Sequence, residues 1–176
     1  MPRQDTQTLH RLHSIFTITR DGLKSGWLPF RQCHYNLDVV PALEVSYQYR
    51  EINQLQLEHA HNIGKIWIEK QSVQMENISQ GGEFCISANV RILKSEQKHQ
   101  YMIKTGPFYR RFLDGYYPFH VIIDIKDPKQ LLRLHTISPT PRPGISWQKQ
   151  ASQNRISAVF SGKLTLSFHF QHRDKR

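Results

Sequence analysis

The chain has 176 residues, and its 24 Lys and Arg residues outnumber 14 Asp and Glu residues, which gives a formal net charge of +10. The 9 Phe, 7 Tyr and 3 Trp residues argue against a disordered chain, because disorder goes with few aromatic side chains. No apolar run approaches the roughly 20 residues of a membrane-spanning helix, which excludes a helical membrane protein.

Regular alternation of apolar and polar residues is the main secondary-structure signal. Successive side chains of a β-strand point to opposite faces, so this period predicts half-buried strands. The clearest examples, in chain order, are 43–50, 84–92, 119–126, 156–160 and 164–170, with shorter candidates at 55–57, 66–68 and 73–75. Turn residues such as Gly81-Gly82 and Ser161-Gly162 separate these segments.

Two segments are candidates for short helices. Residues 107–113 begin with Pro and end near Gly115, as one or two helical turns would. Residues 127–130, with the sequence Asp-Pro-Lys-Gln, resemble a helix cap, although Leu132 and Leu134 continue with the alternation of a strand. We find no amphipathic helices of about ten residues between the strands, which a βαβ arrangement would need.

These patterns predict an all-β fold with one or two short helical turns. An antiparallel β-sandwich, Ig-like or jelly-roll-like, is the first choice, and a barrel is the alternative. We expect a flexible N-terminal segment over 1–13, a single β domain over 14–172 and a basic tail over 173–176. The polar stretch 94–98 allows a subdivision near residue 95, although a hairpin loop explains it as well.

The cellular compartment and the state of the two cysteines are linked. Residues 1–20 contain no export signal. We therefore expect either a cytoplasmic protein or an exported chain whose leader is missing. Cys33 and Cys85 are too far apart in the sequence to form a CxxC pair. An exported chain would form one disulfide between them, whereas a reducing cytoplasm would keep two thiols.

The segment 104–120 combines residue types that are enriched at binding sites. Its Arg side chains can bind carboxylate or phosphate groups, and its rings can stack on bases or sugars. The candidate contact residues are Lys104, Tyr109, Arg110, Arg111, Tyr116, Tyr117 and His120. The alternative is structural: the rings cap one end of the core and Arg110 pairs with Asp114. Both hold together if the rings pack inward and the Arg side chains point outward.

His59-Ala60-His61 is the strongest metal candidate. Residues two apart on a strand face the same way, so both imidazoles can reach one ion. If the alternation of Leu55 and Leu57 continues, both His side chains face inward. A catalytic zinc site needs a third protein ligand, and nothing nearby is spaced to supply it. No cofactor is therefore the first expectation, and a metal ion at His59 and His61 is the alternative.

The common catalytic motifs are missing from the sequence: it has no Gly-x-Ser-x-Gly elbow, no phosphate-binding Gly-rich loop and no HExxH. We therefore expect a non-catalytic binding or accessory module that contacts an anionic partner through residues 104–120. That partner is a protein, a glycan, a lipid surface or a nucleic acid, and scattered charges do not favour specific nucleic-acid reading. Two alternatives are a metal-dependent protein or enzyme that uses His59 and His61, and an assembly domain that pairs through an exposed strand edge.

Overall fold

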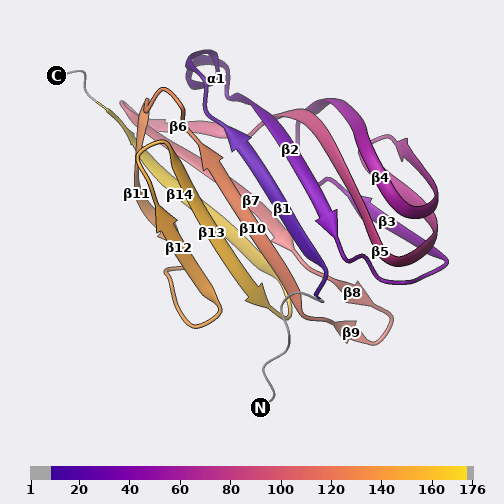
Figure 1. Ribbon diagram of the computed structural model, residues 1–176. Coiled ribbons are helices and arrows are strands. Elements are labelled where there is room, and N and C mark those ends of the chain that lie inside the picture. The colour runs from indigo at the N-terminus through magenta and orange to yellow at the C-terminus, as the bar shows by residue number, and fades with distance from the viewer. Residues whose placement is uncertain (1–8, 174–176) are drawn as a thin grey trace.

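The computed structural model describes residues 9–173, and its regular structure consists almost entirely of strands. Two sheets lie against each other as the layers of a sandwich (Figure 1). The larger sheet has the order β12 (Ile145–Lys149), β13 (Gln153–Phe160), β10 (Phe119–Lys126), β1 (Arg11–Thr17), β2 (Trp27–Tyr35), β5 (Ser72–Arg91) and β3 (Ala42–Ser46), and β4 (Ile52–Glu69) also pairs with β5. The smaller sheet has the order β11 (Leu132–Ser138), β14 (Leu164–His172), β7 (Gln100–Phe108) and β6 (Leu93–Gln97). The expected all-β sandwich is confirmed.

Both sheets are open. The larger sheet ends at β12 on one side and at β3 and β4 on the other, and the smaller sheet ends at β11 and β6. The barrel alternative is therefore wrong. Alternation in the sequence cannot separate the two architectures, because the strands of a barrel and of a sandwich both place every second side chain inside.

The two strands at the centre of the larger sheet, β1 and β10, run parallel. Their register pairs Leu12 with Val121 and Phe16 with Ile125. The other strand pairs of the described residues are antiparallel. The expectation of antiparallel pairing is corrected at this one place. Alternation determines which side chains face inward, but it does not determine the direction of the neighbouring strand.

One hydrophobic core lies between the two sheets. The fully buried side chains that fill it from the larger sheet include Phe16, Leu28, Phe84, Ile86, Ile123 and Ile156. Ile103, Leu166 and Phe168 fill it from the smaller sheet. The polar stretch near residue 95 forms β6 and its turn into β7, and the chain passes there from the larger to the smaller sheet.

The first described residues belong to the fold. His10 is buried and β1 begins at Arg11, so residues 9–13 are not the flexible segment that the sequence predicts. The alternation is hard to recognise there because the inward position between Leu12 and Phe16 is occupied by a serine, Ser14. Residues 1–8 lie outside the described residues.

The described part of the basic tail is also held by the fold. The backbone N–H of Arg173 donates to the carbonyl of Leu131, and its guanidinium donates to the carbonyls of Leu132 and Ala151. Arg173 is therefore an anchor of β11 rather than part of a solvated end. Residues 174–176 lie outside the described residues.

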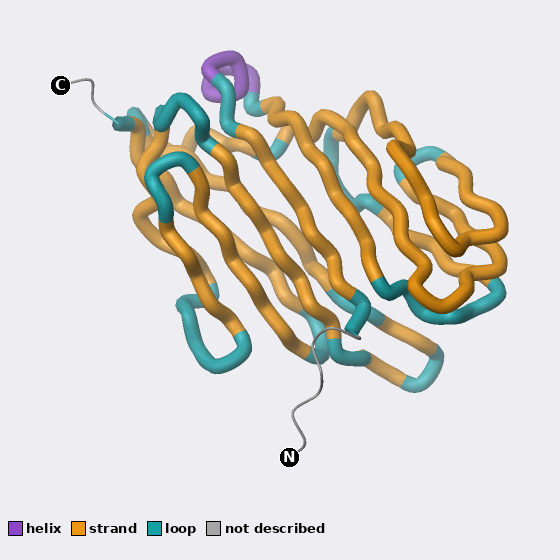
Figure 2. The backbone as a smooth tube through the Cα atoms, in the orientation of Figure 1, coloured by secondary structure: helices purple, strands orange, loops and turns teal. Residues whose placement is uncertain are grey.

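One short helix, α1 (Arg20–Ser25), connects β1 to β2 and is purple in Figure 2. The side chain of Thr19 accepts a hydrogen bond from the backbone N–H of Gly22 at 2.9 Å and caps the first turn. Gly26 ends the helix in the left-handed conformation, with φ of 81°. Within the described residues, no helix has the length and apolar character needed to cross a membrane.

The two segments expected to form helical turns do not form them. Residues 107–113 pass from the end of β7 into a short strand, β8 (Arg111–Phe112). The carboxylate of Asp127 accepts hydrogen bonds from the backbone N–H groups of Leu131 and Leu132, at 3.0 and 2.7 Å. This carboxylate stabilises a turn rather than a helix, because the next residues pair with β14 as strand β11.

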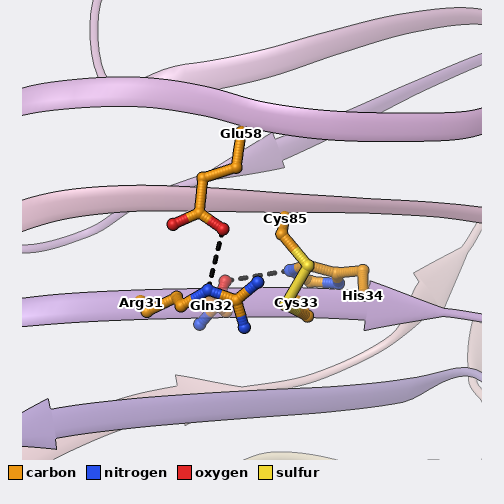
Figure 3. Close-up of a disulfide and its surroundings, with 6 residues drawn as sticks. All are labelled: Arg31, Gln32, Cys33, His34, Glu58 and Cys85. Atoms are coloured by element: carbon orange, nitrogen blue, oxygen red, sulfur yellow. Dashed lines mark hydrogen bonds and ion pairs between the residues drawn. A yellow bond between two sulfur atoms is a disulfide. The ribbon is translucent and has the colours of Figure 1, made fainter.

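Cys33 and Cys85 form a disulfide (Figure 3). They lie opposite each other in the antiparallel register of β2 and β5, which explains how residues far apart in the sequence meet. On the same side of the sheet, Arg31 donates to Glu58 across β5 at 2.7 Å (Figure 3). The disulfide and this ion pair together connect three neighbouring strands.

Removal of the disulfide is expected to lower the free energy of unfolding by about 2–4 kcal/mol, because the bond restricts the unfolded chain over a long loop. Urea unfolding of the Cys33→Ala, Cys85→Ala double variant measures this loss. As a control, a reducing agent should lower the urea midpoint of the parent protein and leave that of the double variant unchanged. Equal stability of parent and variant under oxidising conditions would contradict the prediction.

Candidate functional site

A cavity of about 290 Å³ opens at one end of the sandwich, and we call it the end cavity. One wall is the inner face of the larger sheet at β1 and β2, and the others are β3 with the residues after it and the segment 106–112, which runs from the end of β7 to residue 112. This volume lies at the lower end of the range of small-molecule sites. The lining residues used in the argument below are His10, Gln32, His34, Tyr47, Tyr49 and Phe108.

A chain of hydrogen-bonded polar side chains lies in the wall formed by β1 and β2. His10 Nε2 and His34 Nδ1 are 3.0 Å apart, and His34 Nε2 and Gln32 Oε1 are 2.9 Å apart. Gln32 Nε2 donates to Ser14 Oγ at 2.8 Å. His10, His34 and Gln32 are only 7%, 2% and 3% exposed. Each polar side chain is thus buried with a hydrogen-bond partner, as burial requires.

Burial keeps both histidines uncharged at neutral pH. Burial is the largest of the effects that lower the pKa of His10 from 6.5 to about 4. The negative charge of Asp38 raises this pKa, and the positive charge of Arg110 lowers it. Burial also lowers the pKa of His34 well below its usual value, and the charge of His10 lowers it further. The two rings therefore offer the cavity neutral donors and acceptors rather than cationic groups.

Two tyrosines after β3 form the facing wall. Tyr49 forms a hydrogen bond between its hydroxyl and Thr105 Oγ1 on β7, at 3.2 Å. The hydroxyl of Tyr47 is buried and has no hydrogen-bond partner among the described residues. Burial raises the pKa of both phenols, so they stay protonated. Their rings pack edge-on against Phe30, at 6.3 Å for Tyr47 and 5.3 Å for Tyr49.

A short hairpin, formed by β8 and β9 (Gly115–Tyr116), projects from the sandwich (Figure 1). Both residues of β8 line the end cavity. Arg110 holds the base of the hairpin in place. The guanidinium donates to both carboxylate oxygens of Asp38 and to the carbonyl of Pro118, the latter at 3.0 Å. It also lies 5.6 Å from the ring of Phe112 and 5.5 Å from that of Tyr117.

The chain enters this hairpin through a position that requires glycine. Gly106 has φ of 103°, and a Cβ atom there would lie 2.6 Å from the carbonyl oxygen of Leu164. The end of β7 therefore approaches β14 closely before the chain turns toward the cavity. The register of β7 against β14 shifts at this place, and the ladder ends at Phe108, so that the residues after it form part of the cavity wall.

The outer surface of the hairpin is aromatic and cationic. Tyr109 and Tyr116 are exposed and pack edge to face, with ring centroids 6.2 Å apart. Arg111 lies 6.0 Å from the ring of Tyr116, and Lys163 lies 5.6 Å from the ring of Tyr109. Leu113 at the tip is fully exposed. We call these five residues the hairpin patch.

The structure brings together only some of the residues that the sequence singled out. Tyr109, Arg111 and Tyr116 lie in the hairpin patch, whereas Arg110 and Tyr117 are at its base. Arg110 pairs with Asp38 and not with Asp114, which instead accepts hydrogen bonds from the hydroxyl of Tyr117 at 2.8 Å. These bonds raise the pKa of the Tyr117 phenol.

Two further candidates lie away from the hairpin. Lys104 is exposed on β7, between the buried side chains of Ile103 and Thr105. His120 belongs to β10, and its Nε2 lies 2.9 Å from Ser157 Oγ on β13. Burial, and then the charge of Arg11, lowers the pKa of His120. Neither side chain lines the end cavity.

The metal candidates His59 and His61 lie on β4 and are exposed, not inward-facing as the alternation of Leu55 and Leu57 predicts. The register of β4 against β5 shifts between Leu57 and His59. A bulge inserts an extra residue and reverses which side chains face the core. The inward position passes to Ala60, and both His side chains turn to solvent.

One group of possible ligand atoms does form around His59. Atoms of Glu58, His59 and Cys85 all lie within 4.8 Å of one another. Cys85 is oxidised in the disulfide, so its sulfur is not the thiolate that binds metal ions, and Glu58 is paired with Arg31. His61 does not belong to this group.

No protein family and no curated protein matches this sequence. The fold and the geometry at the end cavity are therefore the basis for any functional conclusion. They define a β-sandwich with a neutral, partly aromatic cavity and a projecting cationic hairpin at the same end.

Sequence reasoning missed most residues of the cavity wall. The missed side chains are His10, Ser14, Gln32, His34, Asp38, Tyr47 and Tyr49. A signal was available in β2, where Leu28 and Phe30 share the inward face with Gln32 and His34. Polar residues at core positions of a strand break the local pattern, and such breaks occur at functional sites.

The free energy of unfolding is expected to fall as the pH is lowered from about 6.5 to about 4. The folded state holds the pKa of His10 below its usual value, so the unfolded state takes up protons first and is stabilised. His10 alone contributes up to roughly 3 kcal/mol of this loss. Urea unfolding across this pH range measures it. The variant His10→Gln should show a smaller pH dependence than His135→Gln, which changes an exposed histidine; equal slopes would contradict the assignment.

The variant Asp38→Asn is expected to loosen the β8–β9 hairpin, because it leaves the guanidinium of Arg110 without its charged partner. We expect a loss of about 1–2 kcal/mol for this partly exposed pair. Hydrogen exchange of the Tyr117 amide, which donates to the carbonyl of Arg110, should accelerate. Glu51→Gln, which breaks the exposed pair with Arg91, is the control and should change the stability by less than about 0.5 kcal/mol.

Proposed function

We propose that this protein is a non-catalytic binding module that meets an anionic ligand or partner through the hairpin patch. The observation that carries the proposal is the grouping of two exposed tyrosines, two cations and an exposed leucine on one projecting hairpin and the turn beside it. Arg and Tyr are the residue types enriched where binding energy concentrates. The net charge of +10 adds a general attraction to polyanions.

The two arginines have different roles in this proposal. Arg110 is only 17% exposed in its side chain and is neutralised by Asp38, so it positions the hairpin. Arg111 is exposed, and no ion pair is found for it among the described residues. Its charge is available for a partner. Lys163, on the turn before β14, supplies a second cation across the tyrosine pair.

The tyrosine pair makes the patch suited to partners that combine negative charge with flat or ring-shaped groups. Rings of Tyr109 and Tyr116 stand at 88° to each other, so they present one face and one edge. Aromatic side chains lose little conformational entropy on binding compared with long flexible ones. Acidic sugars, nucleotides and lipid headgroups all combine an anionic group with a ring or flat group of this kind.

Retention on heparin at low salt tests this proposal. The double variant Arg111→Ala, Lys163→Ala should elute at a lower salt concentration than the parent protein, because phosphate- or sulfate-like groups lose two cationic partners. The matched control is Lys94→Ala, Lys98→Ala, which removes the same charge from two exposed residues near the β6–β7 turn. We expect little change for the control.

The comparison between the two double variants decides the outcome. An equal shift in both would mean that heparin responds to net charge alone, and it would overturn the proposed patch. The absence of any shift in the Arg111 and Lys163 variant would overturn it as well. Circular dichroism of each variant confirms that the sheets are intact.

A further inference from the structure

The end cavity is electrically neutral at its wall. The charges of Asp38 and Arg110 are paired with each other. Glu44 and Arg111 also border the cavity; both are exposed to solvent and their charges are opposite, so the lining has no net charge. The buried histidines are uncharged at neutral pH. A lining without net charge gives a charged ligand little to offset the hydration that it loses on burial. The cavity therefore differs in character from the cationic hairpin patch beside it.

The hydrogen bonds of the polar chain have a direction. Gln32 donates through Nε2 to Ser14, so its Oε1 accepts from His34 Nε2. With Nε2 of His34 protonated, its Nδ1 is an acceptor and receives the proton of His10 Nε2. A neutral imidazole carries one ring proton, so the Nδ1 of His10 is an acceptor.

This acceptor is available to a ligand. Among the described residues the Nδ1 of His10 has no hydrogen-bond partner, and the side chain of His10 lines the cavity. Among the described residues, the fully buried polar atoms without a partner do not include the Nδ1 of His10, so this atom is accessible and a hydroxyl or N–H group placed there gains a hydrogen bond. The charged groups that act on the pKa of His10 are Asp38 and Arg110, which are paired with each other.

The rest of the cavity lining is mixed: Glu44, Ser46 and Gln48 contribute polar groups, and an aromatic part lies beside them. Phe108, Phe119, Tyr47 and Tyr49 contribute rings, and Val45 on the edge strand β3 contributes a small half-buried side chain. Tyr49 is fixed to the opposite sheet through Thr105, so the wall is held in position without a ligand. Flat apolar molecules fit such a lining, because aromatic rings pack well face to edge.

We propose that the end cavity binds a small uncharged molecule with a flat apolar body and one hydroxyl or N–H group, which donates a hydrogen bond to Nδ1 of His10. This inference goes beyond the anionic partner of the hairpin patch, because it concerns a different ligand and centres on His10; of the patch, only Tyr109 and Arg111 also border the cavity. The two sites lie at the same end of the sandwich.

Three aromatic probes of one shape test the ligand chemistry by isothermal titration calorimetry at neutral pH. 2-Naphthol has the hydroxyl donor, 2-methoxynaphthalene has no donor, and 2-naphthoate carries a negative charge. We expect 2-naphthol to bind, the methyl ether to bind about 3- to 10-fold more weakly, and the naphthoate to bind more weakly still. Equal affinity of naphthol and its ether would overturn the assignment to His10, and preference for naphthoate would overturn the neutral site.

Two tryptophan variants locate the site. Val45→Trp fills the cavity and should abolish 2-naphthol binding, whereas Val159→Trp changes a half-buried valine on β13, outside the lining, and should leave binding unchanged. His10→Phe keeps a ring but removes Nδ1, so naphthol and its methyl ether should bind it equally. Retained naphthol binding in Val45→Trp would overturn the location.

The heparin measurement separates this inference from the proposed function. Val45→Trp should elute from heparin with the parent protein while losing 2-naphthol. Failure of 2-naphthol to bind the parent protein would overturn the cavity site and leave the heparin result untouched. Conversely, 2-naphthol binding by the parent protein together with unchanged heparin elution of the Arg111→Ala, Lys163→Ala variant would overturn the hairpin patch and leave the cavity site untouched.

Discussion

The structure depends on how the larger sheet buries polar side chains on an otherwise apolar inner face. Ser14, Gln32 and His34 occupy inward positions of β1 and β2, and a buried polar group must be hydrogen-bonded. They satisfy this constraint by bonding to one another in series, which fixes the orientation of every group in the chain. The series ends at His10, where the two sheets separate and the end cavity begins.

The ion pair between Arg110 and Asp38 connects this interior to the surface. Asp38 lies in the connection between β2 and β3, and Arg110 lies at the base of the β8–β9 hairpin. The pair therefore holds two walls of the cavity together. Because Arg110 is committed to this contact, the neighbouring Arg111 is the arginine that faces outward. A cavity with neutral walls and a cationic patch thus arise from the same pair of adjacent arginines.

Long strands with an uninterrupted period were predictable from sequence. The alternation over 119–126 coincides with β10, whose inward residues Val121, Ile123 and Ile125 are fully buried. β4 shows the limit of the method: it shifts register at three places, and its inward residues are two or three positions apart. A bulge depends on pairing with β5, which no local pattern encodes. For this reason, the prediction that His59 and His61 face inward was wrong.

The all-β class, the strands with regular alternation and the concentration of Arg and Tyr between residues 104 and 120 could be recognised without a structure. These properties are local, because a side chain's polarity and its neighbours two positions away are enough to express them. The parallel pairing of β1 with β10, the partner of Arg110 and the contact of His10 with His34 became known from the folded chain alone. Each of these joins residues well separated in the chain, and their proximity results from the packing of the two sheets.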